Sequence, residues 1–128
     1  MHTILICDDD RDIVSALDIY LASEGYRTLK AYNGLEAIQA VERNEVHLIL
    51  MDIMMPVMNG YEAAKMIRAL DRDDAKTVPI IAMTANAFTE DRLKSKESGM
   101  NEHIAKPIDA KLLVKVISEF VENKEEDS

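Results

Sequence analysis

Three carboxylates are placed where two buried strands are expected to end. Asp8 and Asp9 directly follow the apolar run 3–7, and Asp52 directly follows the apolar run 48–51. Two carboxylates about 4 Å apart repel each other by roughly 4 kcal/mol at an effective dielectric constant near 20, so these side chains can gather only if a positive charge neutralises them. An all-oxygen, partly hydrated site suits Mg²⁺ better than a metal that prefers sulfur or nitrogen. We therefore expect these three carboxylates to hold a magnesium ion.

A hydroxyl and an amine are expected at the same edge. Thr84 follows the fourth apolar run and Lys106 follows the fifth. A metal, a carboxylate, a lysine and a hydroxyl together are the groups that phosphoryl transfer requires, because its catalysis is mostly positioning and neutralisation of charge on the phosphoryl oxygens. Asp52 is the candidate nucleophile, with Asp8 and Asp9 holding the metal. Lys106 would bind one phosphoryl oxygen, and Thr84 would donate a hydrogen bond to another.

The apolar runs that precede these residues predict the fold. Short apolar runs alternate with longer stretches of helical periodicity, which is the pattern of strand and helix units around a parallel sheet. The runs at 3–7, 48–51 and 79–83 are unbroken, as expected for strands covered on both faces. The runs at 26–31 and 103–105 are more polar or shorter and are expected at the edges. Right-handed crossovers then favour a doubly wound five-stranded parallel sheet of order 2-1-3-4-5, in the α/β class.

Helices are expected between these runs. Gly25 is expected to end the first helix in a left-handed cap, and Gly99 to end a helix over about 89–98. A polar connection is expected over 71–77, and the last helix is expected to place Leu112 on its apolar face, together with Leu113, Val116, Ile117 and Phe120.

Length and composition limit the class of protein. The 128 residues fit one domain, expected over 1–122 and followed by a charged C-terminal tail over 123–128. Fifteen Lys and Arg against 24 Asp and Glu give a formal charge of -9, which disfavours direct binding to nucleic acid. A single cysteine, Cys7, cannot form an internal disulfide, and no signal peptide or membrane segment is recognised. We therefore expect a cytoplasmic protein.

Four motifs give the chain a family resemblance. The acidic pair in ILICDDD, the segment MDIMMPVMNG, the Thr-Ala of AMTANAF and the Lys-Pro of HIAKP occur in this order, each at the end of an expected strand. Over nearly its whole length the sequence resembles the receiver domain of two-component response regulators, which has a flavodoxin-like fold. The string GMNEHIAKPI is most similar to receivers of hybrid sensor histidine kinases, so the cytoplasmic part of a membrane-bound kinase is a second expected location.

The resemblance implies roles for the residues around Asp52. Asp52 would accept a phosphoryl group from a phosphohistidine on a histidine kinase or a histidine phosphotransfer protein. Asp9 and Asp52 would contact Mg²⁺ directly, Asp8 partly through water, and the backbone carbonyl of Met54 would complete the ligands. Lys106 would pair with Asp52 or with its phosphoryl group. A phosphorelay therefore requires a phosphohistidine partner, and the sequence does not specify the downstream target.

The resemblance also implies a switch. Thr84 would move toward the phosphoryl group, and the change would reach the face formed by the fourth helix, the fifth strand and the fifth helix of the family. Receivers usually carry a Tyr or Phe three residues before the lysine, where this sequence has His103, which is smaller and titratable. Met54 and Asn86 occupy the positions that flank the attacking water in relatives, and because a methionine cannot orient water we expect slow self-dephosphorylation. Three further residues have expected structural roles, namely Pro56, Gly60 and Pro107, the last in a cis Lys106-Pro107 bond.

Other functions fit parts of the pattern. Asp8 and Asp10 have the spacing of the nucleophile and acid in small phosphatases of the haloacid-dehalogenase type, although the Thr or Val usual after that pair and a cap insertion are lacking. A non-phosphorylated pseudo-receiver that serves as an interaction module is a further alternative, although the complete acid, hydroxyl and lysine set disfavours it. A flavin-binding domain of the same topology fits poorly, because three acids after the first strand would repel the flavin phosphate.

Overall fold

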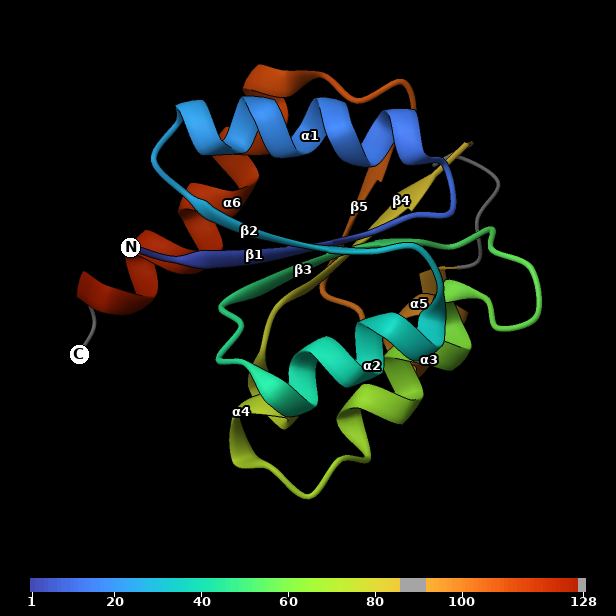
Figure 1. The fold of residues 1–128 in the computed structure, drawn as a ribbon. Coiled ribbons are helices and arrows are strands. Elements are labelled where there is room, and N and C mark those ends of the chain that lie inside the picture. Colours follow the sequence, from blue (N-terminus) through green and yellow to red (C-terminus); the bar gives the residue numbers. More distant parts are fainter. Residues whose placement is uncertain (86–91, 127–128) are drawn as a thin grey trace.

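The structure is a five-stranded parallel sheet with helices on both faces. The computed structural model describes residues 1–85 and 92–126 (Figure 1). The strands lie in the order β2-β1-β3-β4-β5 and all pairings are parallel, so the predicted topology is confirmed. In chain order the elements are β1 (Thr3–Cys7), α1 (Arg11–Ser23), β2 (Arg27–Ala31), α2 (Gly34–Arg43), β3 (Leu48–Asp52), α3 (Gly60–Arg68), α4 (Asp73–Thr77), β4 (Ile80–Thr84), α5 (Arg92–Glu97), β5 (Glu102–Ala105) and α6 (Ala110–Glu126).

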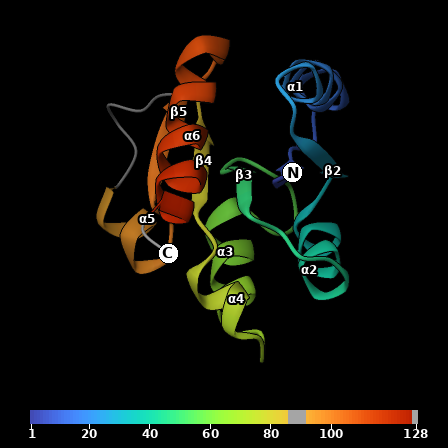
Figure 2. The ribbon, with the colours of Figure 1, turned by 90° about the vertical axis from the view of Figure 1, so that its left-hand side faces the viewer.

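The sheet separates two apolar layers. On one face, α1 and α6 pack on the strands through side chains such as Leu21, Leu50 and Ile117 (Figure 1). On the other face, α2, α3 and α4 pack on side chains such as Met51 and Ile80. Every residue of β1, β3 and β4 is buried, which explains their unbroken apolar sequences. Figure 2 shows β2 with α1 and α2 on one side, and β5 with α5 and α6 on the other.

Side chains fix the helix starts next to the strand ends. The Asp10 carboxylate accepts hydrogen bonds from the backbone amides of Asp12 and Ile13, which satisfies free donors in the first turn of α1. Asn33 caps α2 in the same way. Asn59 caps α3 and forms a reciprocal capping box with Glu62, which satisfies two free backbone donors at the helix start. These caps set where each loop at the carboxyl edge of the sheet ends.

The expected helix ends at Gly25 and Gly99 are confirmed. Their φ angles are 92° and 91°, in the left-handed region that glycine adopts without steric cost. Gly60 is different, because its φ is not in this region and its role is close approach of two backbone segments. A Cβ at Gly60 would lie 2.4 Å from the carbonyl oxygen of Asp52, so glycine lets α3 begin directly against the end of β3.

Two expectations need correction. The connection 71–77 is not wholly irregular, because it contains the short helix α4, in which Ala75 is the buried residue. Five residues with one buried side chain give no helical periodicity in the sequence. Leu112 is 47% exposed and does not face the core, whereas Leu113 is buried. In the charged segment 123–128, α6 continues through Glu126, and both the charged tail and the domain boundary at 122 stay predictions.

No helix in the described ranges is long and apolar enough to cross a membrane.

Candidate functional site

The strand register brings the chemically interesting residues to one edge of the sheet. Cys7 pairs with Met51, and Asp52 pairs with Met83, so β3 ends one residue beyond β1, and β4 ends one residue beyond β3, at the same edge of the sheet. Asp52 and Thr84 are the last residues of β3 and β4, rather than the first residues after them. The acids that follow β1 and the lysine that follows β5 therefore open onto the same edge.

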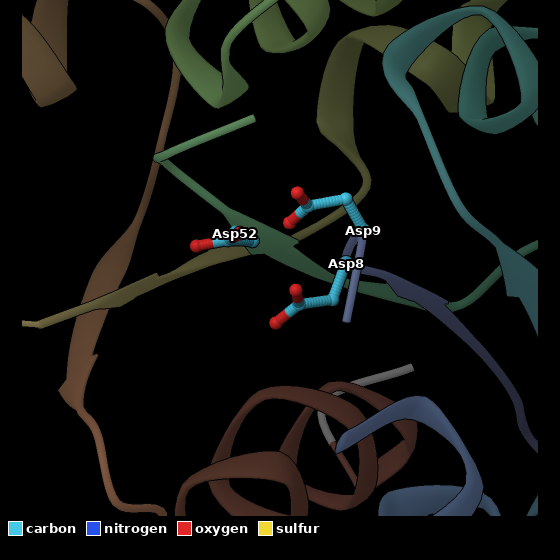
Figure 3. Close-up of side chains that lie close together, drawn as sticks. All are labelled: Asp8, Asp9 and Asp52. Carbon is cyan, nitrogen blue, oxygen red and sulfur yellow. The ribbon is translucent and has the colours of Figure 1, made fainter. Parts of the chain in front are cut away.

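The three acidic side chains converge there. Asp8, Asp9 and Asp52 each offer one carboxylate oxygen, and these oxygens lie within 4.8 Å of one another (Figure 3). Asp8 is fully buried and Asp52 is 3% exposed, whereas Asp9 is exposed to solvent. Two buried carboxylates beside a third are a costly arrangement without a cation. The donors are all hard oxygens with one solvent-facing side, which fits Mg²⁺ and leaves room for the waters that this ion retains.

Lys106 lies between the two buried acids. Its Nζ is 2.8 Å from Oδ2 of Asp8 and 3.3 Å from Oδ1 of Asp52. The expected pair with Asp52 is therefore present, and the shorter contact is to Asp8. The other oxygen of Asp8 accepts a hydrogen bond from the backbone amide of Asp10 at 2.9 Å, and Oδ1 of Asp52 accepts one from the amide of Met54 at 3.3 Å. These bonds hold both carboxylates in place.

The surroundings shift the pKa values of the pair. Burial raises the pKa of Asp52, the charge of Asp8 raises it further, and Lys106 lowers it, which leaves a pKa of about 6. Burial lowers the pKa of Lys106, but the hydrogen bond to Asp8 and the charge of Asp52 outweigh burial, so the net shift is upward. At neutral pH the lysine is therefore charged and Asp52 is mostly ionised, which is the protonation state that a nucleophilic carboxylate needs.

The other predicted residues lie around this cluster. Thr84 is fully buried at the end of β4, and the peptide bond between Lys106 and Pro107 is cis, as expected. The side chain of Met54 is 69% exposed in the loop after β3. In the same loop Pro56 is exposed, and its carbonyl accepts a hydrogen bond from the amide of Met58 at 2.8 Å. Asn86 lies outside the described residues.

His103 has a partner that sequence reasoning missed. It lies on β5, and its Nε2 is 2.6 Å from the hydroxyl of Ser95, which is buried on α5. The bond depends on how α5 packs against β5 in the folded chain, so no periodicity or spacing in the sequence indicates it. The residue at the expected switch position is thus tied to the neighbouring helix.

Comparisons with known proteins agree with this geometry. The family model of the response regulator receiver domain matches residues 4–118. A probable transcriptional regulator, ycf29, from Porphyra purpurea is 32% identical over 120 residues, which cover 94% of this chain and 56% of that protein. The chain thus spans about half the length of this relative.

Two solved structures are informative about ligands and partners. The receiver domain of a sensor histidine kinase from Pseudomonas aeruginosa, solved with a magnesium ion coordinated in the active site cleft, has a TM-score of 0.85 and 35% identity, and the match covers 94% of this chain and 97% of that one. The receiver domain of Ssk1 from Saccharomyces cerevisiae, solved in complex with the histidine phosphotransfer protein Ypd1, has a TM-score of 0.83 and 30% identity, with 94% and 88% covered.

Proposed function

Because the chain belongs to the response regulator receiver domains of two-component signalling systems, we propose that it accepts a phosphoryl group at Asp52 from a phosphohistidine on a partner protein. The observation that carries this proposal is the convergence of Asp8, Asp9 and Asp52 around the amine of Lys106 at one edge of the sheet. A buried carboxylate that is ionised at neutral pH and held by a lysine is positioned to act as a nucleophile.

The transfer follows from the positions of these groups. An oxygen of Asp52 attacks the phosphorus, the bond from phosphorus to the donor nitrogen breaks, and the departing imidazole takes up a proton. Lys106 already lies 3.3 Å from Asp52, so it can bind an oxygen of the transferred group with little rearrangement. The Thr84 hydroxyl would donate a hydrogen bond to a further phosphoryl oxygen.

The acidic cluster is the proposed magnesium site. Asp8, Asp9 and Asp52 would hold the ion, together with the backbone carbonyl of Met54. The bound ion supplies positive charge to the phosphoryl oxygens. The magnesium ion in the Pseudomonas aeruginosa receiver supports this assignment.

The donor is proposed to dock beside α1. A groove of about 380 Å³ lies between this helix and the loop that leads into α6. Apolar side chains of Ile13, Leu17 and Ile108 line it, and Lys106 reaches its edge. An apolar groove next to the acceptor suits the side of a helix that presents a phosphohistidine. The Ssk1 complex shows that a related receiver binds a phosphotransfer protein.

The output is proposed to be the face formed by α5, β5 and α6. The extra helix α4 shifts the labels, so this face corresponds to the fourth helix, fifth strand and fifth helix of the family. A phosphoryl group gives Lys106 and Thr84 new hydrogen-bond acceptors in one arrangement only, and such a difference in contacts is what a population shift requires. His103 would pass the change to α5 through its bond to Ser95.

Intact-mass analysis tests this function. After incubation with Mg²⁺ and acetyl phosphate, the wild-type protein should gain one labile phosphoryl group, and Asp52→Asn should gain none. Labelling of Asp52→Asn would overturn the assignment. Sustained hydrolysis of small phosphate esters by Asp52→Asn would instead favour the phosphatase alternative.

A further inference from the structure

A cleft lies at the amino ends of β4 and β5, whereas the acidic cluster lies at the carboxyl ends of the strands. Its volume is about 810 Å³, and it is bordered by the carboxyl end of α3, the end of α4 and the connection from α5 to β5. None of its lining residues takes part in the proposed phosphoryl transfer. We call it the basic cleft, and its lining includes Arg68, Lys76, Lys96, Asn101, Glu102 and His103.

The basic cleft concentrates positive charge in an acidic protein. Three cationic side chains line it, those of Arg68, Lys76 and Lys96, against the single carboxylate of Glu102. The chain as a whole has a formal charge of -9. Among the side chains that the structure describes, 1–85 and 93–122, no carboxylate forms an ion pair with any of these three cations. Their charge is therefore available to a ligand from outside the chain.

Arg68 is the least compensated of the three cations. Its half-buried guanidinium donates to the carbonyl of Gly99 at 2.7 and 3.2 Å, to the carbonyl of Ala75 at 3.1 Å and to the side-chain oxygen of Asn101 at 3.1 Å. These acceptors are neutral, so they satisfy the N–H groups but supply no counter-charge. Burial lowers the pKa of Arg68 because it destabilises the charged form. A negative charge in the cleft would offset this cost.

The arrangement of the cations favours an extended anion over a compact one. A phosphate or sulfate site needs several unused N–H groups that converge on one point, and most of those of Arg68 already donate to protein oxygens. The ammonium groups of Lys76 and Lys96 come from two different helices, α4 and α5. The cleft is also as large as a pocket for a ligand of many atoms. Several carboxylates along one peptide match this spread of charge.

Glu102 shows that a carboxylate can be held at the rim of the cleft. It is the first residue of the edge strand β5, and its Oε1 accepts a hydrogen bond from the backbone amide of His103 at 2.9 Å. Glu102 therefore occupies a donor that a ligand carboxylate could use, and its charge repels an incoming anion. An acidic ligand must compete with it.

We propose that the basic cleft binds an acidic segment of a partner protein, with the carboxylates of that segment lying against Lys76 and Lys96 and beside the guanidinium of Arg68. This site lies at the other ends of the strands from Asp52, so the binding does not require a phosphoryl group there. The partner is thus distinguished from the phosphohistidine donor by both its place and its chemistry.

The test is the binding of a dye-labelled peptide of alternating Glu and Gly to the full chain, followed by fluorescence anisotropy at low salt. Wild-type protein should bind it saturably and should not bind the same peptide with Gln in place of Glu. Lys96→Gln should weaken binding about threefold, as expected for loss of one exposed charge contact. Glu102→Gln should strengthen it by roughly a factor of two, because a competing carboxylate is removed. Both positions are exposed, so neither change removes a core contact.

Two variants at the opposite edge of the sheet are the matched controls. Arg27→Gln changes the net charge as Lys96→Gln does, and Glu24→Gln changes it as Glu102→Gln does. Arg27 and Glu24 are exposed and lie at the start of β2 and at the end of α1, far from β5. Neither control should alter the affinity, whereas added salt should weaken binding to all variants because exposed charges are screened.

Absence of saturable binding by wild-type protein would overturn the proposal. So would weaker binding in Glu102→Gln, or effects of the controls equal to those of the cleft variants. Inorganic phosphate that displaces the peptide at the peptide's own half-saturating concentration would assign the cleft to a compact anion, against the proposal. The assay contains no phosphodonor, so its failure would leave the proposed function standing.

Discussion

Asp52 owes its proposed reactivity to a conflict between burial and charge. It is 3% exposed and lies beside Asp8, both of which oppose ionisation, and Lys106 offsets this only in part. Its pKa of about 6 leaves it mostly ionised at neutral pH, but the ionised form is less stable than that of an exposed aspartate. A cation that binds the cluster relieves this cost directly.

This conflict predicts an unusual pH dependence of stability without metal. The pKa of Asp52 is raised from 3.8 to about 6 in the folded protein, so the folded state gains stability as pH falls through 6 and loses it as pH rises. Between one unit above and one unit below that pKa we expect a gain of about 1 kcal/mol in the free energy of unfolding. The measurement is urea denaturation in the presence of a chelator.

Asp52→Asn is the control for other titrating groups. The wild-type protein should become more stable relative to Asp52→Asn as the pH falls. At neutral pH, magnesium should stabilise the wild-type protein and so offset the cost of the ionised Asp52. Magnesium should bind more weakly below pH 6, because protonated Asp52 is a poor ligand. A wild type and variant that respond identically to pH would contradict the assigned environment of Asp52.

Met54 predicts the lifetime of the phosphorylated form. Its exposed thioether side chain lies two residues after Asp52 and cannot orient a water molecule by a strong hydrogen bond. We expect the phosphoryl group to be lost slowly, and Met54→Asn to speed the loss by roughly a factor of ten or less, since an amide can position the water. The mass of the phosphorylated protein after donor removal gives the rate. Met66→Asn, at an exposed methionine on α3, is the control, and slower loss in Met54→Asn would count against this role.

At the level of elements, side chains in the connections hold neighbouring helices together. Arg72 is the clearest case. Its guanidinium donates to the carbonyls of Val41 and Glu42 at the end of α2, the latter at 3.0 Å, and to the carboxylate of Asp74 at 2.8 Å. These bonds satisfy carbonyls that a helix end leaves free and hold α4 against α2. The sequence places Arg72 in a polar connection and gives no indication of this contact.

Removal of this contact should cost stability rather than function. We expect Arg72→Ala to lower the free energy of unfolding by about 1–2 kcal/mol. Several carbonyls lose a charged donor, and hydrogen bonds to water recover only part of the lost stabilisation. Arg72→Lys should recover less than half, since an ammonium group cannot reach the same carbonyls together. Phosphorylation of Arg72→Ala below its unfolding transition should match wild type. If Arg72→Ala had the same melting curve as wild type, the hydrogen bonds of Arg72 would contribute nothing to stability.

At the level of the whole molecule, the parts predictable from sequence are those with local patterns. The unbroken apolar runs predicted β1, β3 and β4 and hence the strand order. The positions of the strand ends then predicted that the side chains of Asp8, Asp9, Asp52 and Lys106 lie close together at one edge of the sheet. The short helix α4 was missed because one buried side chain gives no period. The bond from His103 to Ser95 was missed because it depends on how α5 packs on β5. The functional roles of these residues follow from family membership and geometry and stay predictions.

The same packing predicts where the molecule responds to phosphorylation. We expect amide hydrogen exchange to change in α5, β5 and the start of α6. Thr84 ends β4, next to β5, and Lys106 lies between β5 and α6, while the bond from His103 to Ser95 joins β5 to α5. The core strands β1 and β3 should be unaffected. Ser95→Ala should weaken the response in α5 while leaving uptake of the phosphoryl group intact. A change confined to the loops around Asp52 would contradict the proposed output face.

The most direct test of the central claim is to locate the phosphoryl group chemically. Borohydride reduces an acyl phosphate to an alcohol, so the phosphorylated aspartate becomes homoserine, which peptide mass spectrometry can map. After treatment with acetyl phosphate and Mg²⁺, the account predicts homoserine at position 52 alone. Homoserine at position 8 or 9, or a phosphoryl group that survives reduction on another side chain, would contradict it.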